Sequence, residues 1–183
     1  MGGGVDRSLQ SGDAMTAAVI GATGRIGSQV VRGLLTRGGA VAALVRDPAK
    51  ARRVFGEADG LHIRPTCLDD PRDVAEAFEG IRRVFIAMGS IGIEGVLQRI
   101  AINAAAGISS IEQVTRLSVL NASADSLGIN QRAHYSIDRF ASSTALPYRR
   151  SAPQSSRRHC SPRHMRCAPR APGPALPAAA VWP

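Results

Sequence analysis

The sequence predicts an α/β fold in which a doubly wound, Rossmann-like parallel sheet is covered by helices on both faces. Two observations carry this prediction. Short apolar runs alternate along the chain with segments of helical period, so that five clear strand–helix units follow one another. The first run also ends in a glycine-rich turn that leads into a helix. With 183 residues, 44% of them apolar, the chain is long enough for one ordinary domain.

The apolar runs have the length and composition of buried parallel strands. They cover residues 17–20, 41–45, 61–64, 83–87 and 114–119. Parallel strands need crossover connections, and the helical segments between the runs supply them. All five strands are therefore expected in one sheet, joined by right-handed crossovers.

Helical segments follow the strands. Two of them begin at an Asp-Pro pair, Asp47-Pro48 and Asp70-Pro71, in which the aspartate caps the helix and the proline occupies its first position. The last helix is expected over residues 132–144, before Pro147. Two others show an apolar face at helical spacing: Ile26, Val30, Val31, Leu34 and Leu35 in the first, and Val96, Leu97, Ile100, Ala101 and Ala104 in the fourth.

The two ends of the chain differ in composition from the part between them. Residues 1–14 are glycine-rich and polar, so we expect a disordered leader, and Met15 is a plausible true start for a domain over residues 15–148. Residues 149–183 hold seven of the 11 prolines, seven of the 23 basic residues and no acidic residue. Such a segment has too few large apolar side chains to offset the loss of chain entropy. A disordered Arg/Pro-rich tail is therefore expected over residues 149–183.

Several classes of protein are excluded by composition. No run reaches the roughly 18 apolar residues of a membrane span, and residues 1–14 lack the apolar segment of a secretory signal. Three cysteines do not make a disulfide framework. We therefore expect a cytoplasmic protein with no membrane partner. Cys67, at the end of the third strand, is expected to be a small buried residue.

The turn after the first strand has the sequence Gly-Ala-Thr-Gly-Arg-Ile-Gly. We expect Gly21 to permit the tight turn, Gly24 to let the backbone approach a pyrophosphate, and Gly27 to let the helix pack close to the strand. The spacing is GxxGxxG and not GxGxxG, and a helix start that needs flexible entry is the alternative for glycines alone. The preceding strand and the following helix favour a nucleotide-binding loop.

The residue that follows the second strand bears on the choice of cofactor. About 20 residues past the glycine turn, such folds place the group that meets the adenosine ribose, and here that group is Arg46. A guanidinium suits a 2′-phosphate, whereas a carboxylate would accept from a free 2′-hydroxyl. NADP(H) is therefore favoured over NAD(H). Asp47 is left with two roles, ribose contact or helix cap, and Lys50 either adds to the phosphate clamp or is solvated.

Five segments within residues 17–148 carry a resemblance to a known family: VIGATGRIGSQVV, LVRDPAKA, CLDDPRDVAEAFEGIRRVFI, RLSVLNA and HYSIDRFASSTALPY. The chain resembles the NmrA-like branch of the atypical short-chain dehydrogenase/reductases. These are NAD(P)-binding proteins that include quinone-reductase-like members and redox-sensing regulators. The resemblance implies contacts with each part of the dinucleotide. The pyrophosphate would lie along Thr23, Arg25 and Ile26, and the adenine would be bordered by Asp69. After the fourth strand the cofactor would be lined by Ala87, Met88 and Gly89, and the nicotinamide would lie near Ser118.

The chain departs from the carbonyl-reducing members, which use a Tyr-x-x-x-Lys pair. Aligning the last helix through Asp138 places His134 at the lysine position and Asn130 at the tyrosine position, so the pair is absent. His134 is a candidate contact for the nicotinamide ribose or a proton relay, and the alternative is a helix residue packed on the sheet. The candidate catalytic residues are therefore Ser118 and His134, with no metal.

The family pattern is also lost after Tyr148, where relatives continue with a buried sixth strand and then the substrate-covering half. Here the chain continues as RRSAPQSS, and 22 arginines against one lysine indicate GC-rich coding DNA. A frameshift product over residues 149–183 is the hypothesis, with the sixth strand and the substrate-covering C-terminal part missing. The alternatives for this segment are phosphate contacts to nucleic acid, for which aromatic residues are lacking, and a zinc site. The zinc site would use Cys160, Cys167, His159 and His164.

These features favour an NADPH-dependent oxidoreductase of the atypical short-chain type that acts on a quinone or similar small electrophile. Hydride transfer to a quinone needs no Tyr/Lys pair, because the cofactor carries the chemistry. Binding without turnover in the truncated form is left open. The alternative is a non-catalytic NADP(H) redox sensor or transcriptional regulator that acts through a protein partner. The expected partners are the dinucleotide and a small substrate or regulatory protein, not nucleic acid.

Overall fold

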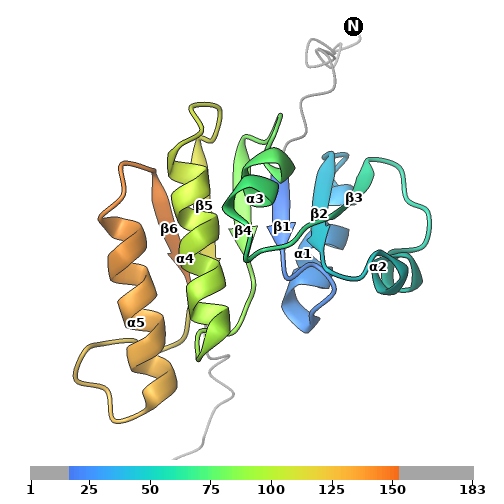
Figure 1. The fold of residues 1–183 in the computed structure, drawn as a ribbon. Helices are drawn as coiled ribbons and strands as arrows, with labels where there is room; N and C mark the ends of the chain where they lie inside the picture. Colours follow the sequence, from blue (N-terminus) through green and yellow to red (C-terminus); the bar gives the residue numbers. More distant parts are fainter. Residues whose placement is uncertain (1–16, 153–183) are drawn as a thin grey trace, which may run out of the picture.

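A six-stranded parallel sheet runs through residues 17–152, the part of the chain that the computed structural model describes (Figure 1). The strands lie in the order β3-β2-β1-β4-β5-β6, and all five neighbouring pairs are parallel. The predicted Rossmann-like α/β fold is therefore confirmed. The strands are β1 (Ala17–Ile20), β2 (Val41–Val45), β3 (Leu61–Pro65), β4 (Arg83–Ile86), β5 (Gln113–Leu117) and β6 (Tyr148–Ser151).

Five helices connect the strands: α1 (Arg25–Leu35), α2 (Pro48–Phe55), α3 (Pro71–Ala77), α4 (Ile93–Ala106) and α5 (Ile129–Ser142). Both Asp-Pro starts are confirmed. The Asp47 carboxylate accepts from the Lys50 N–H at 2.9 Å, and the Asp70 carboxylate accepts from the Arg72 N–H at 2.8 Å. Helix α5 begins three residues before the expected position, and β5 ends at Leu117 rather than at residue 119.

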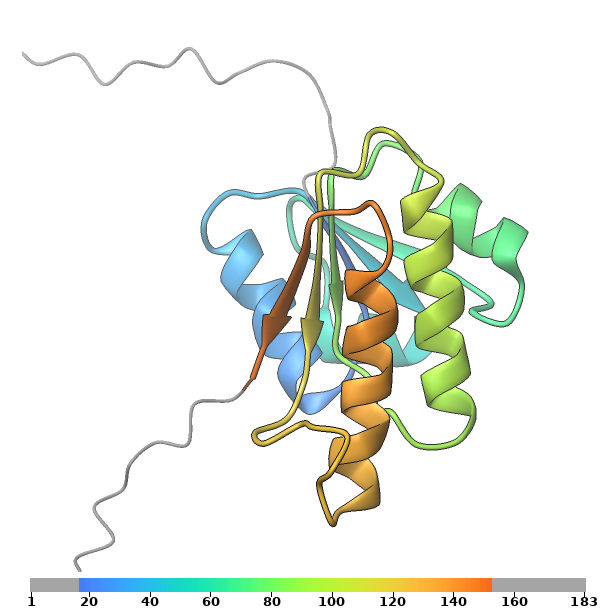
Figure 2. The same cartoon turned by 90° about the vertical axis from the view of Figure 1, so that its left-hand side faces the viewer.

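The core has two layers, one on each face of the sheet. Val19 and Ala43 point toward α1 and α2, whereas Ile20 and Leu44 point toward α3, α4 and α5, because successive strand residues face opposite sides. Figure 2 shows α4 and α5 side by side on the second face. Every residue of β1 and β2 is buried, which is why these strands are continuously apolar.

A sixth strand is present, so the expectation that it is missing and that a disordered tail starts at residue 149 is wrong. β6 pairs with β5 from Val114 opposite Tyr148 to Leu117 opposite Ser151. The Tyr148 hydroxyl donates to Asp138 at 2.5 Å. An edge strand leaves one side in solvent, so it accommodates the exposed Arg149 and Arg150 that composition alone assigned to a tail.

The remaining expectations about the chain ends lie outside the described residues. These are the disordered leader over residues 1–14, the frameshift hypothesis for residues 149–183 as far as it concerns residues 153–183, the absent substrate-covering part, and the alternatives for the tail. Within residues 17–152, no helix is long and apolar enough to cross a membrane. The prediction of a buried Cys67 is wrong, because its thiol is exposed and donates to Asp69 at 2.7 Å. Its neighbours Thr66 and Leu68 are buried, and the Cys67 side chain between them faces solvent.

Candidate functional site

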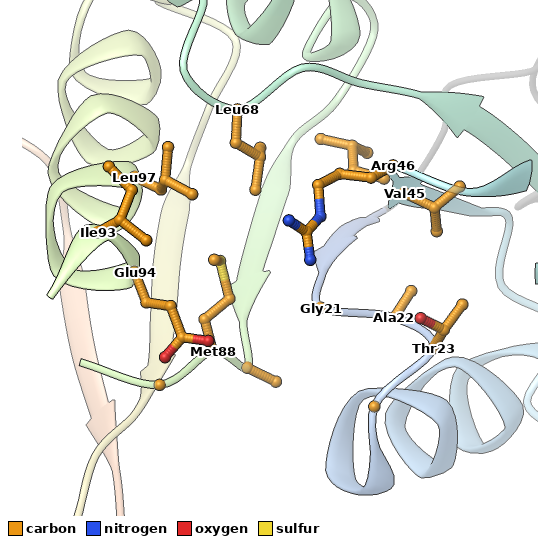
Figure 3. Close-up of a pocket in the computed structure, with 14 residues that line it drawn as sticks. Gly21, Ala22, Thr23, Val45, Arg46, Leu68, Met88, Ile93, Glu94 and Leu97 are labelled. Atoms are coloured by element: carbon orange, nitrogen blue, oxygen red, sulfur yellow. The ribbon is translucent and has the colours of Figure 1, made fainter. Parts of the chain in front are cut away.

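A cavity of about 330 Å³ opens at the carboxyl edge of the sheet, between the turn after β1, the end of β2, the end of β4 and the first turns of α4 (Figure 3). This is the position at which open parallel sheets bind ligands, because the chain leaves β1 and β4 toward opposite faces. The lining residues are Gly21, Ala22, Thr23, Gly24, Leu44, Val45, Arg46, Leu68, Ala87, Met88, Gly89, Ile93, Glu94 and Leu97.

The glycine turn forms one wall of the cavity. Gly21 has φ of +76°, and a Cβ there would lie 3.0 Å from the Ala87 carbonyl carbon and closer still to its oxygen. Only glycine fits this turn, because φ is positive and because the Ala87 carbonyl leaves no room for a Cβ. The Gly24 N–H donates to the Gly21 carbonyl at 3.0 Å, and α1 begins at the next residue without a side-chain cap. The helix start thus offers backbone N–H groups and a positive dipole end to an anion.

Gly27 determines how closely α1 approaches this turn. A Cβ at Gly27 would lie 2.8 Å from the Gly21 carbonyl carbon, closer still to its oxygen, and 3.1 Å from the Ala22 Cα. No real Cβ packs that tightly against backbone, so the approach requires glycine. Gly27 does not line the cavity, and its contribution is to hold the helix start in place.

Arg46 extends its guanidinium from the end of β2 into the cavity, toward the glycine turn (Figure 3). Its neighbour Asp47 caps α2 with one carboxylate oxygen, and the other lies 3.9 Å from Arg53. Of the two roles left open for Asp47, helix capping is the one seen. Lys50 contributes its backbone N–H to that cap and does not line the cavity.

The opposite wall comes from β4 and α4. Ala87, Met88 and Gly89, which the family resemblance expects beside the cofactor, line this wall, and the α4 side chains Ile93, Glu94 and Leu97 complete it. The three α4 residues were missed from the sequence. They could have been found by topology, because α4 follows β4 at the same edge of the sheet where α1 follows β1. Glu94 brings an acidic group to the cavity opposite Arg46 (Figure 3).

Not all predicted cofactor contacts line this cavity. Of the expected set, Gly21, Thr23, Gly24, Arg46, Ala87, Met88 and Gly89 lie together in the lining, whereas Arg25, Ile26, Gly27, Lys50 and Asp69 do not. Asp69 follows the lining residue Leu68 in the chain, and its carboxylate accepts a hydrogen bond from the Cys67 thiol. The two candidate catalytic residues, Ser118 and His134, lie elsewhere, and a catalytic role for them stays a prediction.

Ser118 and His134 belong to a buried polar group that we call the Arg116 cluster: Ser90, Gln98, Arg116, Ser118, His134 and Asp138. Arg116 is fully buried on the β5 face that α4 and α5 cover. Sequence reasoning missed it, although a charged residue two positions after Val114 in a buried strand was a signal. Its guanidinium is balanced by an ion pair with Asp138, which also accepts from Ser118 at 2.7 Å and from Tyr148.

The other donors of Arg116 are also occupied. Its Nε donates to the Gln98 side-chain oxygen at 2.6 Å, and its Nη2 donates to the Ser90 hydroxyl at 2.7 Å. Nη2 also lies 2.7 Å from His134 Nδ1. Arginine carries no acceptor, so His134 Nδ1 must accept, which fixes the neutral tautomer with its proton on Nε2. Among residues 17–152, no buried side-chain nitrogen or oxygen lacks a hydrogen-bond partner.

The environment of His134 predicts a dependence of stability on pH. Burial, and then the Arg116 charge, lower the pKa of His134 from 6.5 to about 4, although Asp138 opposes this. Below pH 6.5 the unfolded chain therefore binds a proton that the folded chain refuses. We expect the free energy of unfolding to fall by on the order of 3 kcal/mol between pH 6.5 and 4 on this account. Above pH 6.5 this contribution is constant.

The measurement is denaturant unfolding at a series of pH values for the wild type and for His134→Asn, which keeps an acceptor near Arg116 but does not titrate. Other carboxylates change both curves alike, so the difference between the curves isolates His134. Parallel curves from pH 7 to pH 4 would contradict the lowered pKa of the buried imidazole.

The cavity as a whole fits a dinucleotide. It joins a helix start suited to phosphate, a guanidinium suited to a second phosphate, and apolar walls from β2, β4 and α4 suited to flat rings. In residues 17–152, no group of three or more His, Cys, Asp or Glu side chains is arranged to hold a metal ion.

The comparisons with known proteins agree with this geometry. A family described as NAD(P)H-binding matches residues 21–153. A curated relative, the NAD(P)H azoreductase of Xenophilus azovorans, is 34% identical over 121 residues, which are 62% of this chain and 41% of that protein. The chain thus spans less than half the length of this curated relative.

Two solved structures share the fold. The NADPH-dependent quinone oxidoreductase of Escherichia coli, in complex with NADPH, matches with a TM-score of 0.64 and 24% identity, over 73% of this chain and 47% of that one. NmrA, a negative transcriptional regulator in complex with NADP, matches with a TM-score of 0.64 and 19% identity, over 75% and 44%. The described fold thus occurs both in a reductase and in a regulator.

Proposed function

The chain belongs to the NAD(P)H-binding family, and we propose that it binds NADPH in this cavity as an oxidoreductase that reduces a quinone or similar small electrophile. The observation that carries the proposal is the Arg46 guanidinium, which shares one cavity with the glycine turn. A dinucleotide whose pyrophosphate lies at the start of α1 would bring its adenosine ribose to the end of β2.

The start of α1 is the candidate site for the pyrophosphate. Gly24 precedes the helix and carries no side chain, so the backbone can approach a phosphate closely. The first N–H groups of α1 have no side-chain cap to compete with an anion. Thr23 also lines the cavity and offers a hydroxyl next to these groups.

The preference for NADPH over NADH rests on charge. Arg46 places a permanent positive charge where an NAD-specific site would place a carboxylate. The nearby carboxylate of Asp47 accepts the α2 cap bond and lies near Arg53, so it is engaged away from a ribose hydroxyl. The crystal structure of the Escherichia coli quinone oxidoreductase also contains NADPH, which supports the same assignment.

Bound NADPH supplies the hydride, and this chain's residues are left to orient the cofactor and exclude water. Met88, Ile93 and Leu97 form an apolar wall of the cavity. Ile91 and Val96, in the same segment, are about half exposed, so an apolar surface adjoins the cavity. Such a surface suits a flat, uncharged acceptor, as in a quinone.

Replacing Arg46 tests the cofactor preference. In Arg46→Ala we expect the dissociation constant for NADPH to rise about tenfold or more, because a hydrogen bond between charged groups contributes roughly 1.5–3 kcal/mol. The affinity for NADH should change less than twofold. Arg52→Ala removes one positive charge from the neighbouring helix and serves as the control, since Arg52 is exposed and does not line the cavity. Equal losses for both cofactors in Arg46→Ala would contradict the contact with the 2′-phosphate.

Turnover is tested by following NADPH absorbance with a panel of benzoquinones and naphthoquinones. The proposal expects oxidation of NADPH that depends on both the quinone and the protein. The protein must first be shown to be saturated with NADPH by fluorescence titration. A saturated protein that oxidises no NADPH with any quinone would overturn the reductase assignment.

A regulatory function is the second candidate, and one observation favours it. Ser118 and His134 are engaged in the Arg116 cluster and do not line the cavity, which supports a function without turnover. The similarity in fold to NmrA, a transcriptional regulator, points the same way. Binding of NADPH without turnover, together with a partner protein that binds only one redox form of the complex, would favour the regulator.

A further inference from the structure

Gln98 connects the Arg116 cluster to the wall of the cofactor cavity. It lies on α4 and is fully buried. Its side-chain oxygen accepts from Arg116 Nε at 2.6 Å. Its amide nitrogen donates to the Gly89 carbonyl and lies 3.4 Å from the Ser90 hydroxyl. Gly89 lines the cavity, so a single buried side chain links the cavity wall to the interior ion pair.

The orientation of the Gln98 amide is dictated by Arg116. A guanidinium has five N–H donors and no acceptor, so only the oxygen of Gln98 can face it. The NH₂ group must then face the other way, toward Gly89. Exchanging the oxygen and the NH₂ group would place donor against donor at Arg116 and acceptor against acceptor at Gly89. Buried polar groups that face each other without a hydrogen bond in this way cost free energy.

The bond to Gln98 in turn fixes a peptide group of the cavity wall. Gly89 is exposed, yet its carbonyl is directed to a side chain with no exposed surface. In a trans peptide the N–H points opposite to the carbonyl, so the Ser90 N–H is oriented by the same bond. The Glu94 side chain lies against this part of the wall, since its carboxyl carbon would be 2.9 Å from a Cβ at Gly89.

We propose that Gln98 and Arg116 are positioning residues for the cofactor, because they fix the orientation of the Gly89–Ser90 peptide that borders it. This inference rests on the proposed binding of NADPH in the cavity. Asp138 alone is enough to neutralise the charge of Arg116. The hydrogen bond from Gln98 to the Gly89 carbonyl is the contact through which the cluster reaches the cavity wall. If Gln98 served packing alone, its side-chain oxygen would not need to face Arg116 and its NH₂ group would not need to face the Gly89 carbonyl.

Gln98→Glu separates positioning from packing. Glutamate has nearly the same shape and can accept from Arg116, but its carboxylate cannot donate to the Gly89 carbonyl and repels it. We expect the dissociation constant for NADPH to rise about tenfold, as for the loss of one buried hydrogen bond with an acceptor left unpaired. We also expect the backbone amide resonance of Ser90 to shift in the cofactor-free protein. The thermal midpoint should also fall, because the Gly89 carbonyl is left unpaired against the buried side chain, so the NADPH affinity and the Ser90 resonance are the readouts that report positioning.

Arg99→Met is the matched control, because Arg99 follows Gln98 on α4 and reaches Ser136 on α5 at 2.7 Å, outside the cluster. It should leave the Ser90 resonance and the NADPH affinity unchanged. If Gln98→Glu does not fold, Gln98→Met replaces it, since Met fills the space with no donor. A folded Gln98 variant with wild-type affinity and an unmoved Ser90 resonance would overturn the inference.

The proposed function is judged separately. A wild-type protein that binds neither NADPH nor NADH contradicts the function. In that case the backbone amide resonance of Ser90 in the cofactor-free variants still tests whether Gln98 orients the Gly89–Ser90 peptide. A shift of this resonance supports the orientation, and an unmoved resonance overturns it.

Discussion

Gly27→Ala is expected to lower the free energy of unfolding by about 3 kcal/mol and to abolish measurable binding of NADPH. The added Cβ would overlap the backbone of Gly21, which is not the flexible end of a side chain and cannot move aside. Helix α1 must therefore shift away from the turn, and the N–H groups at its start shift with it. Stability is measured by denaturant unfolding and affinity by fluorescence titration.

Gly33→Ala is the control, because Gly33 lies in the same helix and a Cβ there would meet no described atom within 4 Å. That substitution should raise the free energy of unfolding by roughly 0.5–1 kcal/mol, since alanine favours the helix over the unfolded chain. If the two variants had the same stability, the close approach of α1 to the turn would be wrong.

Asp138→Ala is expected to lower the free energy of unfolding by about 3–5 kcal/mol, because it leaves the Arg116 charge buried and unpaired. Arg116 has no exposed surface, and the Asp138 side chain is 9% exposed. The same substitution also removes the acceptor of Ser118 and of Tyr148, so it loosens β6 at the edge of the sheet. Hydrogen exchange of the β6 amides should therefore become faster.

A surface ion pair provides the comparison. Glu112 pairs with Arg82, and their side chains are 41% and 56% exposed, so Glu112→Ala should lower the free energy of unfolding by less than about 1 kcal/mol. The double variant Arg116→Met, Asp138→Leu should recover only part of the stability lost in Asp138→Ala, because no unpaired charge remains but the buried partners Gln98, His134 and Ser118 lose their hydrogen bonds. Equal losses for the Asp138 and Glu112 variants would contradict a structural role for the buried pair.

Much of the fold could be predicted from sequence because its signals are local. β1 and β2 are short, uninterrupted apolar runs, and both were predicted with their observed ends. Helices α2 and α3 start at Asp-Pro pairs that cap them wherever they lie in the fold. β6 was missed because its residues are Tyr-Arg-Arg-Ser, and only pairing with β5 makes a strand of them.

The candidate site divides in the same way. The turn from Gly21 to Gly24 and the guanidinium of Arg46 were visible in the sequence, since each follows directly on a strand. Glu94 and Leu97 line the cavity only because β4 lies beside β1, a neighbour relation between segments some 60 residues apart. The Arg116 cluster was harder still to predict from the sequence, because its members come from four separate segments of the chain.

The sequence by itself determined that this chain forms a parallel sheet with a glycine turn suited to a dinucleotide. Its apolar runs, caps and glycines act over a few residues, and the physics of strands and helix starts is the same in any fold. The tertiary structure alone decided which residues share the cavity, where Ser118 and His134 lie, and what balances Arg116. Those are contacts between distant segments, and a buried charge is tolerated only where folding brings its partners to it.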